Sequence, residues 1–142
     1  MVKVAVGSDH GGFEYKAKII DYLKGHNFDY EDVGTFTKDS CDYPIIAKKV
    51  ADKVVSGEAD KGILICGTGI GMSITANKVK GIRAALCSDT FSARATRAHN
   101  NSNILCLGER VIGDCLALDI VDVWLHTEFE GGRHQRRIDE IE

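Results

Sequence analysis

The chain has 142 residues, which is the size of one domain with a single hydrophobic core. Its net charge of −3 lacks the basic excess that general nucleic-acid binding needs, and no apolar run reaches the roughly 20 residues that span a bilayer. Five cysteines form no CxxC pair, so we expect free thiols in a reducing, cytoplasmic setting.

Five strand-like runs alternate with segments of helical length. The runs cover residues 2–7, 29–34, 61–66, 82–87 and 103–108. All but the second are nearly continuous in Val, Ile, Leu, Ala and Cys, which is typical of strands buried on both faces of a parallel sheet. We therefore predict an α/β fold in one domain over residues 1–142, a three-layer α/β/α sandwich with a five-stranded parallel sheet. The first strand is expected to lie centrally, beside the third.

Helical periodicity and end signals fill the segments between these runs. Helices are expected over residues 13–26, 43–57, 70–79, 89–100, 114–129 and about 132–142. The first carries an apolar stripe of Phe13, Ala17, Ile20 and Leu23, and the fifth one of Ile112, Leu116, Ile120 and Trp124. Pro44 is expected near a helix start, Asp89 as an N-cap and Gly57 just beyond a helix end.

The segment CGTGIG, residues 66–71, places a cysteine directly before a glycine-rich loop. It is not a dinucleotide fingerprint, because Met72 stands where the third glycine belongs, and it lacks the Gly-Lys-Ser/Thr ending of a P-loop. Glycines let backbone N–H groups point at a ligand, and the following helix N-terminus should lower the pKa of the Cys66 thiol. Such a thiol suits a general base beside an oxyanion hole, for a proton transfer next to a carbonyl. The alternative is a small buried residue in a tight turn.

Other polar residues follow the neighbouring strands. Asp9 and His10 come after the first strand, at the same sheet edge as Cys66, where they could serve acid–base or ligand-binding roles. Alternatively, Asp9 only caps the first helix and His10 is incidental. Arg110 follows the fifth strand and is a candidate phosphate contact.

His99 lies between the fourth helix and the fifth strand, and it can shuttle protons near neutral pH. The alternative is that this Asn-rich segment only ends the helix. Because the fourth helix runs antiparallel to the strands, we expect His99 at the sheet edge opposite Cys66, from which it could reach the site of a neighbouring subunit.

Arg133 and Arg137 share one face at the start of the last helix, with Arg136 and His134 beside them. Cations there oppose the helix dipole, which suggests a bound anion. A solvated tail is the alternative, and Arg136 could instead pair with a surface carboxylate.

The remaining cysteines, Cys41, Cys87, Cys106 and Cys115, are predicted to be core or near-core thiols because their neighbours are mostly apolar. No metal site is expected, because no Cys/His pair has short ligand spacing.

Taken together, the motifs resemble the type B ribose-5-phosphate isomerase family, which also includes galactose-6-phosphate and allose-6-phosphate isomerases. The resemblance covers nearly the whole chain and is carried by GSDHGGFEYK, DYP, CGTGIGMSI, ANK, GIRAAL, HNN and GGRHQRRI. It implies a Rossmann-like sandwich that forms homodimers, in some relatives tetramers, with active sites shared between subunits. It implies no metal or organic cofactor.

The resemblance also implies roles for single residues. Cys66 would move the proton between C2 and C1, and Met72 stands where some relatives carry a glutamate base. His99 would open the sugar ring, helped by Asp9. The backbone of the glycine loop would hold the enediolate with the help of Asn100. The substrate-binding residues would be His10, Tyr43, Gly67, Thr68, Gly69, Ile70, Gly71, Asn100, Arg110, Arg133 and Arg137.

The expected reaction is the interconversion of D-ribose 5-phosphate and D-ribulose 5-phosphate through a cis-enediolate. An allose-6-phosphate or galactose-6-phosphate isomerase is the alternative within the family. A non-catalytic sugar-phosphate-binding protein would need the arginines but not Cys66 and His99 together. A thiol redox protein would lack a resolving cysteine and leave the arginines unexplained.

Overall fold

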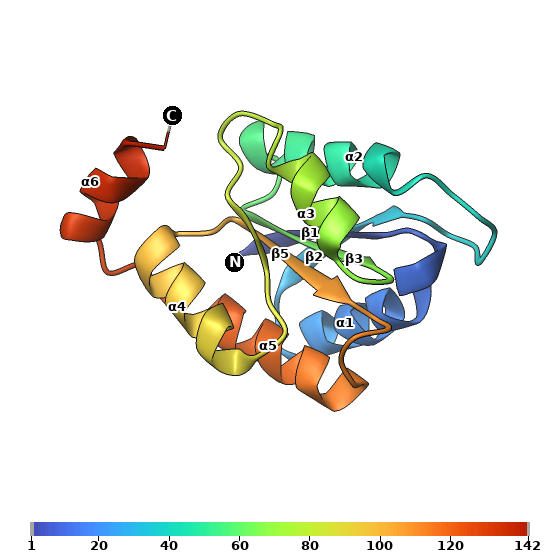
Figure 1. Ribbon diagram of the computed structural model, residues 1–142. Coiled ribbons are helices and arrows are strands. Elements are labelled where there is room, and N and C mark those ends of the chain that lie inside the picture. Colours follow the sequence, from blue (N-terminus) through green and yellow to red (C-terminus); the bar gives the residue numbers. More distant parts are fainter. Residues whose placement is uncertain (1, 142) are drawn as a thin grey trace.

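The computed structural model describes residues 2–141 and has the predicted three-layer architecture (Figure 1). One parallel sheet contains β1 (Lys3–Ser8), β2 (Asp29–Gly34), β3 (Lys61–Cys66), β4 (Ala84–Leu86) and β5 (Ile104–Gly108). The strand order is β2-β1-β3-β5-β4, which confirms the predicted pairing of the first and third strands and makes the third the middle one. The carboxyl ends of β1, β3 and β5 therefore meet at the centre of one edge, where parallel sheets bind their ligands.

Helices cover both faces of this sheet. They are α1 (Phe13–Gly25), α2 (Tyr43–Val55), α3 (Ile70–Ala76), α4 (Thr90–Asn100), α5 (Asp114–His126) and α6 (Arg133–Asp139). Helices α2 and α3 lie on one face and α1, α4 and α5 on the other, while α6 stands away from the sheet and packs against α4 (Figure 1). Across residues 2–141, no helix combines the length and the apolar character needed to cross a membrane.

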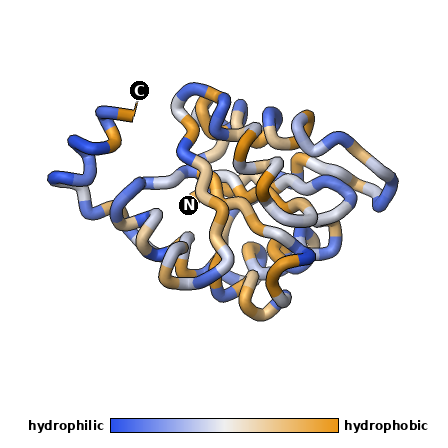
Figure 2. The backbone as a smooth tube through the Cα atoms, viewed as in Figure 1, coloured by the Kyte–Doolittle hydropathy of each residue, from blue (hydrophilic) through white to orange (hydrophobic). Residues whose placement is uncertain are grey.

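Alternate residues of the middle strand enter the two halves of the core. Ile63 and Ile65 pack on the side of α1, α4 and α5, where Trp124 is fully buried, whereas Leu64 and Cys66 pack on the side of α2 and α3. Since strand side chains alternate between faces, a strand covered on both sides is apolar throughout. Figure 2 shows the resulting contrast between the hydrophobic strands at the centre and the largely hydrophilic α6.

The predicted helix-end signals are confirmed. The carboxylate of Asp89 accepts the backbone N–H of Ser92 at 2.6 Å and caps α4. Pro44 lies in the first turn of α2, and Gly57 follows the end of that helix with φ of 83°.

The apolar stripe predicted for α1 is wrong at one position. Ala17 is exposed, whereas the neighbouring Lys16 is only 3% exposed. The Lys16 ammonium lies 2.7 Å from the carboxylate of Asp32 and also donates to the carbonyl of Thr35. A buried charge is tolerated when it is paired and hydrogen-bonded in this way, but an apolar pattern does not reveal it.

Two helices differ from their predicted course. Leu116 is 37% exposed rather than buried, because α5 buries the face that carries Ala117, Val121 and Trp124. The helix expected over residues 70–79 ends at Ala76, since the side chain of Asn77 bonds the backbone N–H and carbonyl of β4 instead. Residues 1 and 142, within the predicted domain and last helix, lie outside the described residues.

Candidate functional site

A glycine loop covers the thiol of Cys66 at the carboxyl end of β3. Cys66 is 5% exposed, and its Sγ accepts the backbone N–H of Gly69 at 3.1 Å. Gly69 has φ of 78°, a conformation that residues with a side chain rarely adopt, and this turns the chain back over the sulfur before α3 begins at Ile70. A negatively charged sulfur would make better use of this N–H donor than a neutral thiol.

Three further N–H groups of the loop are free to bind a ligand. The N–H of Ile70 is taken by the hydroxyl of Thr68 at 3.2 Å, and that of Gly69 by the thiol. Within residues 2–141, the N–H groups of Gly67, Thr68 and Gly71 donate to no protein acceptor. Several unpaired N–H groups around one thiol form a site that suits a negatively charged oxygen.

Asp9 and His10 lie beside this loop, as their position after β1 predicts. The N–H of Asp9 donates to the carbonyl of Ile65 at 3.3 Å, and its carboxylate accepts the N–H of Gly11 at 2.9 Å, capping a short 3-10 turn. His10 is exposed, and its Nδ1 accepts the backbone N–H of Cys41 at 3.2 Å. A neutral His10 ring therefore carries its proton on Nε2, where it can be donated to a ligand.

Arg110 and Tyr43 flank the same loop. The N–H of Arg110 donates to the carbonyl of Gly67 at 3.0 Å, and its guanidinium lies so close that a Cβ on Gly67 would be 3.2 Å from Nη1. The ring of Tyr43 packs against Gly71, and Tyr43 as a whole is 40% exposed. A positive charge and a phenol therefore border the thiol loop within one chain.

The remaining predicted site residues lie elsewhere. His99 and Asn100 lie at the end of α4. The carbonyl of Asn100 accepts a hydrogen bond from Nε of Arg83, which is the residue directly before β4. Because the strands are parallel, this edge is opposite the one that holds Cys66, roughly 15 Å away along a strand of this length. The position of His99 that was predicted from the direction of the fourth helix is therefore confirmed. Arg133 and Arg137 lie exposed on α6, which packs against α4.

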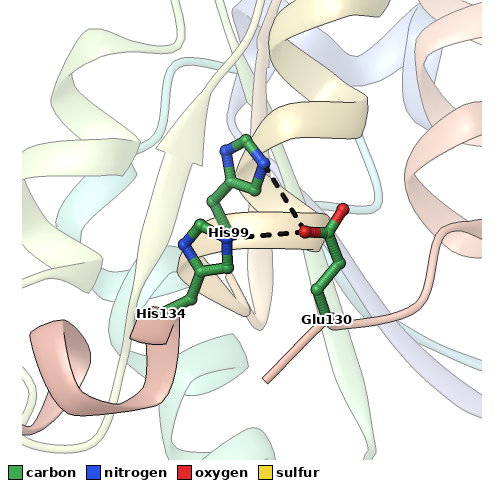
Figure 3. A group of neighbouring side chains, drawn as sticks. All are labelled: His99, Glu130 and His134. Atoms are coloured by element: carbon green, nitrogen blue, oxygen red, sulfur yellow. Dashed lines mark ion pairs between the residues drawn. The ribbon is translucent and has the colours of Figure 1, made fainter. Parts of the chain in front are cut away.

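Figure 3 shows the surroundings of His99. Its ring stacks on that of His134 with 4.4 Å between centroids, and Oε1 of Glu130 lies 3.9 Å from Nε2 of His99 and 3.4 Å from Nε2 of His134. In residues 2–141, these form the one group of three or more potential metal ligands whose ligand atoms lie within 4.8 Å of one another. Glu130 lies four residues before His134, a spacing that could have drawn attention to the pair, but only the fold brings the pair to His99.

The other cysteines have different environments. Cys87 and Cys106 are buried as predicted, and burial, together with the nearby charge of Asp89, raises the pKa of Cys87 to about 11. Burial likewise raises the pKa of Cys106. Cys41 is only partly buried, and the predicted near-core position is wrong for Cys115, which is exposed on the face of α5 that points away from the sheet. The buried pair therefore stays protonated at neutral pH.

An apolar cavity of about 190 Å³ borders the glycine loop and is lined in part by Thr68, Ile70, Leu86 and Val111. The three aliphatic residues are 51%, 43% and 59% exposed. Cys66 does not line it, and an apolar hollow offers few hydrogen bonds to a sugar phosphate. Exposed aliphatic side chains gathered in this way are typical of a protein contact.

Comparisons with known proteins show the family to which the chain is similar. A family model described as Ribose/Galactose Isomerase matches residues 4–141. Ribose-5-phosphate isomerase B of Escherichia coli strain K12 is 50% identical over 141 residues, covering 99% of this chain and 95% of that protein.

Two solved structures extend the match to the fold. Ribose-5-phosphate isomerase B of Clostridium thermocellum has a TM-score of 0.98 at 56% identity, covering 99% of this chain and 95% of the other. Ribose-5-phosphate isomerase B of Mycoplasma genitalium, solved with bound ribulose-5-phosphate, has a TM-score of 0.94 at 46% identity, covering 99% and 93%. The matched region contains both the thiol loop and α6, and the chain belongs to the ribose/galactose isomerase family.

Proposed function

We propose that this chain is an isomerase that interconverts D-ribose 5-phosphate and D-ribulose 5-phosphate through a cis-enediolate. Family membership supports a sugar-phosphate isomerase, and the Mycoplasma genitalium relative carries ribulose-5-phosphate. The observation that carries the proposal is the thiol of Cys66, which accepts one loop N–H at 3.1 Å beside three N–H groups without a protein acceptor.

In this mechanism the Cys66 thiolate removes the proton from C2 of the open-chain aldose and returns it to C1. Negative charge develops on the oxygens of the enediolate, and the free N–H groups of Gly67, Thr68 and Gly71 stabilise it. Gly69 instead holds the thiolate through its N–H. Catalysis by such a positioned base typically contributes 10²–10⁴-fold in rate.

Ring opening precedes this proton transfer. His99 donates a proton to the ring oxygen, and Asp9 helps by accepting the proton of the anomeric hydroxyl. Because His99 and Asn100 lie at the edge opposite their own Cys66, a second subunit supplies them, and Asn100 then assists in holding the enediolate.

The phosphate is bound by groups from both subunits. His10 contributes its Nε2–H and Arg110 its guanidinium from the edge that holds the thiol. Arg133 and Arg137 reach the same phosphate from α6 of the partner, where both are exposed. Tyr43 lines the sugar pocket between them.

A homodimer, or a tetramer built from such dimers, makes these sites complete. The exposed Ile70, Leu86 and Val111 around the apolar cavity provide a surface that a second copy would bury. Helix α6 buries only His134 of its seven residues against its own chain and stands away from the sheet, so it is available to a partner (Figure 1).

A hexose-6-phosphate isomerase is the second candidate, because the family description names galactose beside ribose. A pocket one carbon longer needs only small changes in side chains. Comparison of kcat/KM on ribose 5-phosphate, allose 6-phosphate and galactose 6-phosphate separates the candidates, and we expect the highest value on ribose 5-phosphate.

The base assignment is tested with Cys66→Ala. We expect kcat to fall about 10³-fold or more and deuterium exchange from solvent into C2 to stop, while ribulose 5-phosphate still binds. Cys115→Ala, at an exposed thiol on α5 that has no proposed role in the reaction, is the control and should keep its turnover. Near-normal turnover in Cys66→Ala would exclude the thiol as the base.

A further inference from the structure

The backbone holds His99, Glu130 and His134 together. The N–H of Glu130 donates to the carbonyl of Ala98 at 3.0 Å, in the last turn of α4 next to His99. The N–H of His134 donates to the carbonyl of Gly131 at 3.1 Å, in the first turn of α6. The cluster is therefore positioned by main-chain hydrogen bonds and does not depend on contacts between its own side chains.

The separations between these side chains are too long for hydrogen bonds but match metal ligands. Oε1 of Glu130 lies 3.4 Å from Nε2 of His134 and 3.9 Å from Nε2 of His99, whereas N–H···O bonds are about 2.9–3.0 Å long. Two ligands held about 2.0–2.1 Å from one tetrahedral Zn²⁺ are about 3.4 Å apart. His134 and Glu130 already have this spacing, whereas His99 must turn out of its stack on His134 to point its Nε2 at the same ion.

His134 provides an independent indication of a ligand. Its side chain is only 9% exposed, yet Nε2 has no hydrogen-bond partner among residues 2–141. Buried ring nitrogens are normally paired. The carboxylate of Glu130 is near enough to share a cation with this nitrogen, but it makes no hydrogen bond with it.

The chemistry and exposure of the cluster suit an exchangeable ion. Two imidazoles and one carboxylate are a donor set that Zn²⁺ prefers, and the carboxylate offsets part of the charge of the ion. In the single chain the side chains of His99 and Glu130 are 48% and 58% exposed, and in the proposed dimer they face the site that the substrate enters, so an ion can reach them and a fourth position remains open to water.

We propose that His99, Glu130 and His134 bind one divalent transition-metal ion, best matched by Zn²⁺, with water as the fourth ligand. An imidazole with an ion on Nε2 cannot also carry a proton on that nitrogen, so His99 could no longer form the imidazolium that acts as the acid in ring opening, and the ion inhibits the isomerase reversibly. The inhibition rests on the proposed function, whereas the binding site itself does not. The four-residue spacing of Glu130 and His134 does not by itself reveal such a site, because the third ligand, His99, comes from another helix far away in the sequence.

Binding is tested by titrating Zn²⁺ into the metal-free full-length chain in competition with a chromophoric chelator. We expect one ion per chain, and affinities at least about tenfold weaker in Glu130→Gln and His134→Gln. His126→Gln is the matched control: Nδ1 of His126 also lies 3.4 Å from a carboxylate oxygen, that of Asp122, but no second histidine joins that pair. Its affinity for Zn²⁺ should equal that of the wild type.

Co²⁺ shows which atoms bind the ion. Nitrogen and oxygen ligands give weak visible bands, whereas a thiolate ligand from one of the five cysteines adds intense near-ultraviolet absorption. The site is overturned by absence of Zn²⁺ binding, by unchanged affinity in the variants, or by a cobalt–thiolate band. Thermal melting checks that each variant folds. If His134→Gln unfolds because its side chain is buried, the Zn²⁺ affinity of the exposed Glu130→Gln tests the site alone.

Activity provides a second readout. Zn²⁺ should inhibit the wild type and a chelator should restore its turnover, whereas Glu130→Gln should keep its basal turnover and resist Zn²⁺. An active wild-type chain that binds Zn²⁺ without inhibition would overturn the inhibition but not the site. A chain that binds Zn²⁺ at this cluster but never isomerises a sugar phosphate would overturn the proposed function and leave the site standing.

Discussion

Close contacts at two glycines shape the surroundings of Cys66. A Cβ on Gly12 would overlap the carbonyl of Ile65, the residue before the thiol, and a Cβ on Gly71 would overlap the ring of Tyr43. Neither glycine has a positive φ, so the requirement is for space and not for an unusual backbone conformation. The turn after β1 can therefore lie against the thiol loop only while position 12 has no side chain.

Gly12→Ala should destabilise the fold, because the overlap is with backbone atoms that cannot move aside easily. We expect a loss of about 1–3 kcal/mol in the free energy of unfolding. Gly25→Ala is the matched control: it ends α1 with no atom within 4 Å of an added Cβ, and it should be neutral or stabilising by up to about 1 kcal/mol. Urea unfolding measures both, and equal midpoints for the two variants would contradict the close packing at Gly12.

The thiols should also differ in reactivity with a disulfide reagent at pH 8. Cys115 is exposed and should react rapidly in the native protein. Cys87 has a pKa raised to about 11 by burial, so only about one molecule in 10³ carries its thiolate at this pH, and Cys106 is fully buried. Both should react only on unfolding. Cys115→Ser should remove a fast phase of the reaction. If a fast phase remained in this variant and labelled Cys87, it would contradict the burial of Cys87.

At the scale of the elements, local pattern predicts most of the fold. The strands β1, β3 and β5 could be predicted because both of their faces are buried, whereas the prediction is wrong for the fourth run, since β4 is a short edge strand that leaves Leu86 43% exposed. Asp89 marks a helix start through its side-chain carboxylate, and Gly57 marks a helix end through its positive φ. The glycine loop and Asp9 could be assigned to one sheet edge because parallel strands end together.

Contacts between elements are what local pattern could not predict. Lys16 looks like a surface lysine until the fold brings Asp32 and the Thr35 carbonyl to it. Glu130 similarly meets His99 only because a loop returns to the end of α4. Such pairings depend on tertiary placement, which has no periodicity along the chain.

Lys16 should therefore matter more than a neighbouring lysine of the same helix. Lys16→Met leaves a carboxylate and a carbonyl without their ammonium donor between α1 and the end of β2, and we expect a loss of about 2 kcal/mol. Lys18→Met breaks only an exposed pair with Asp114 and should cost less than about 1 kcal/mol. Chemical denaturation measures the loss in free energy of unfolding for both variants. Equal losses would show that the burial of Lys16 adds nothing to the stability of the fold.

For the whole molecule, the sheet separates the residues proposed to act together. Cys66 ends β3 at one edge, and His99 ends α4 at the other, so a fold of this kind cannot bring both to one sugar within a single chain. The proposed two-fold dimer would resolve this, because each partner would supply to the other what it cannot supply to itself. The exposed apolar surface around Leu86 gives such a dimer a place to form.

Shared sites make a specific prediction for a mixed dimer of Cys66→Ala and His99→Asn chains, co-expressed with different tags and purified through both. One of its two sites would combine both changes and the other would have neither, so the mixed dimer should have about half the wild-type activity per dimer. Each homodimer should be nearly inactive and serves as the control. If Cys66 and His99 instead acted within one chain, both sites of the mixed dimer would carry one change each, and it would be as inactive as its parents. Isomerase assays on the three purified dimers therefore separate the two arrangements.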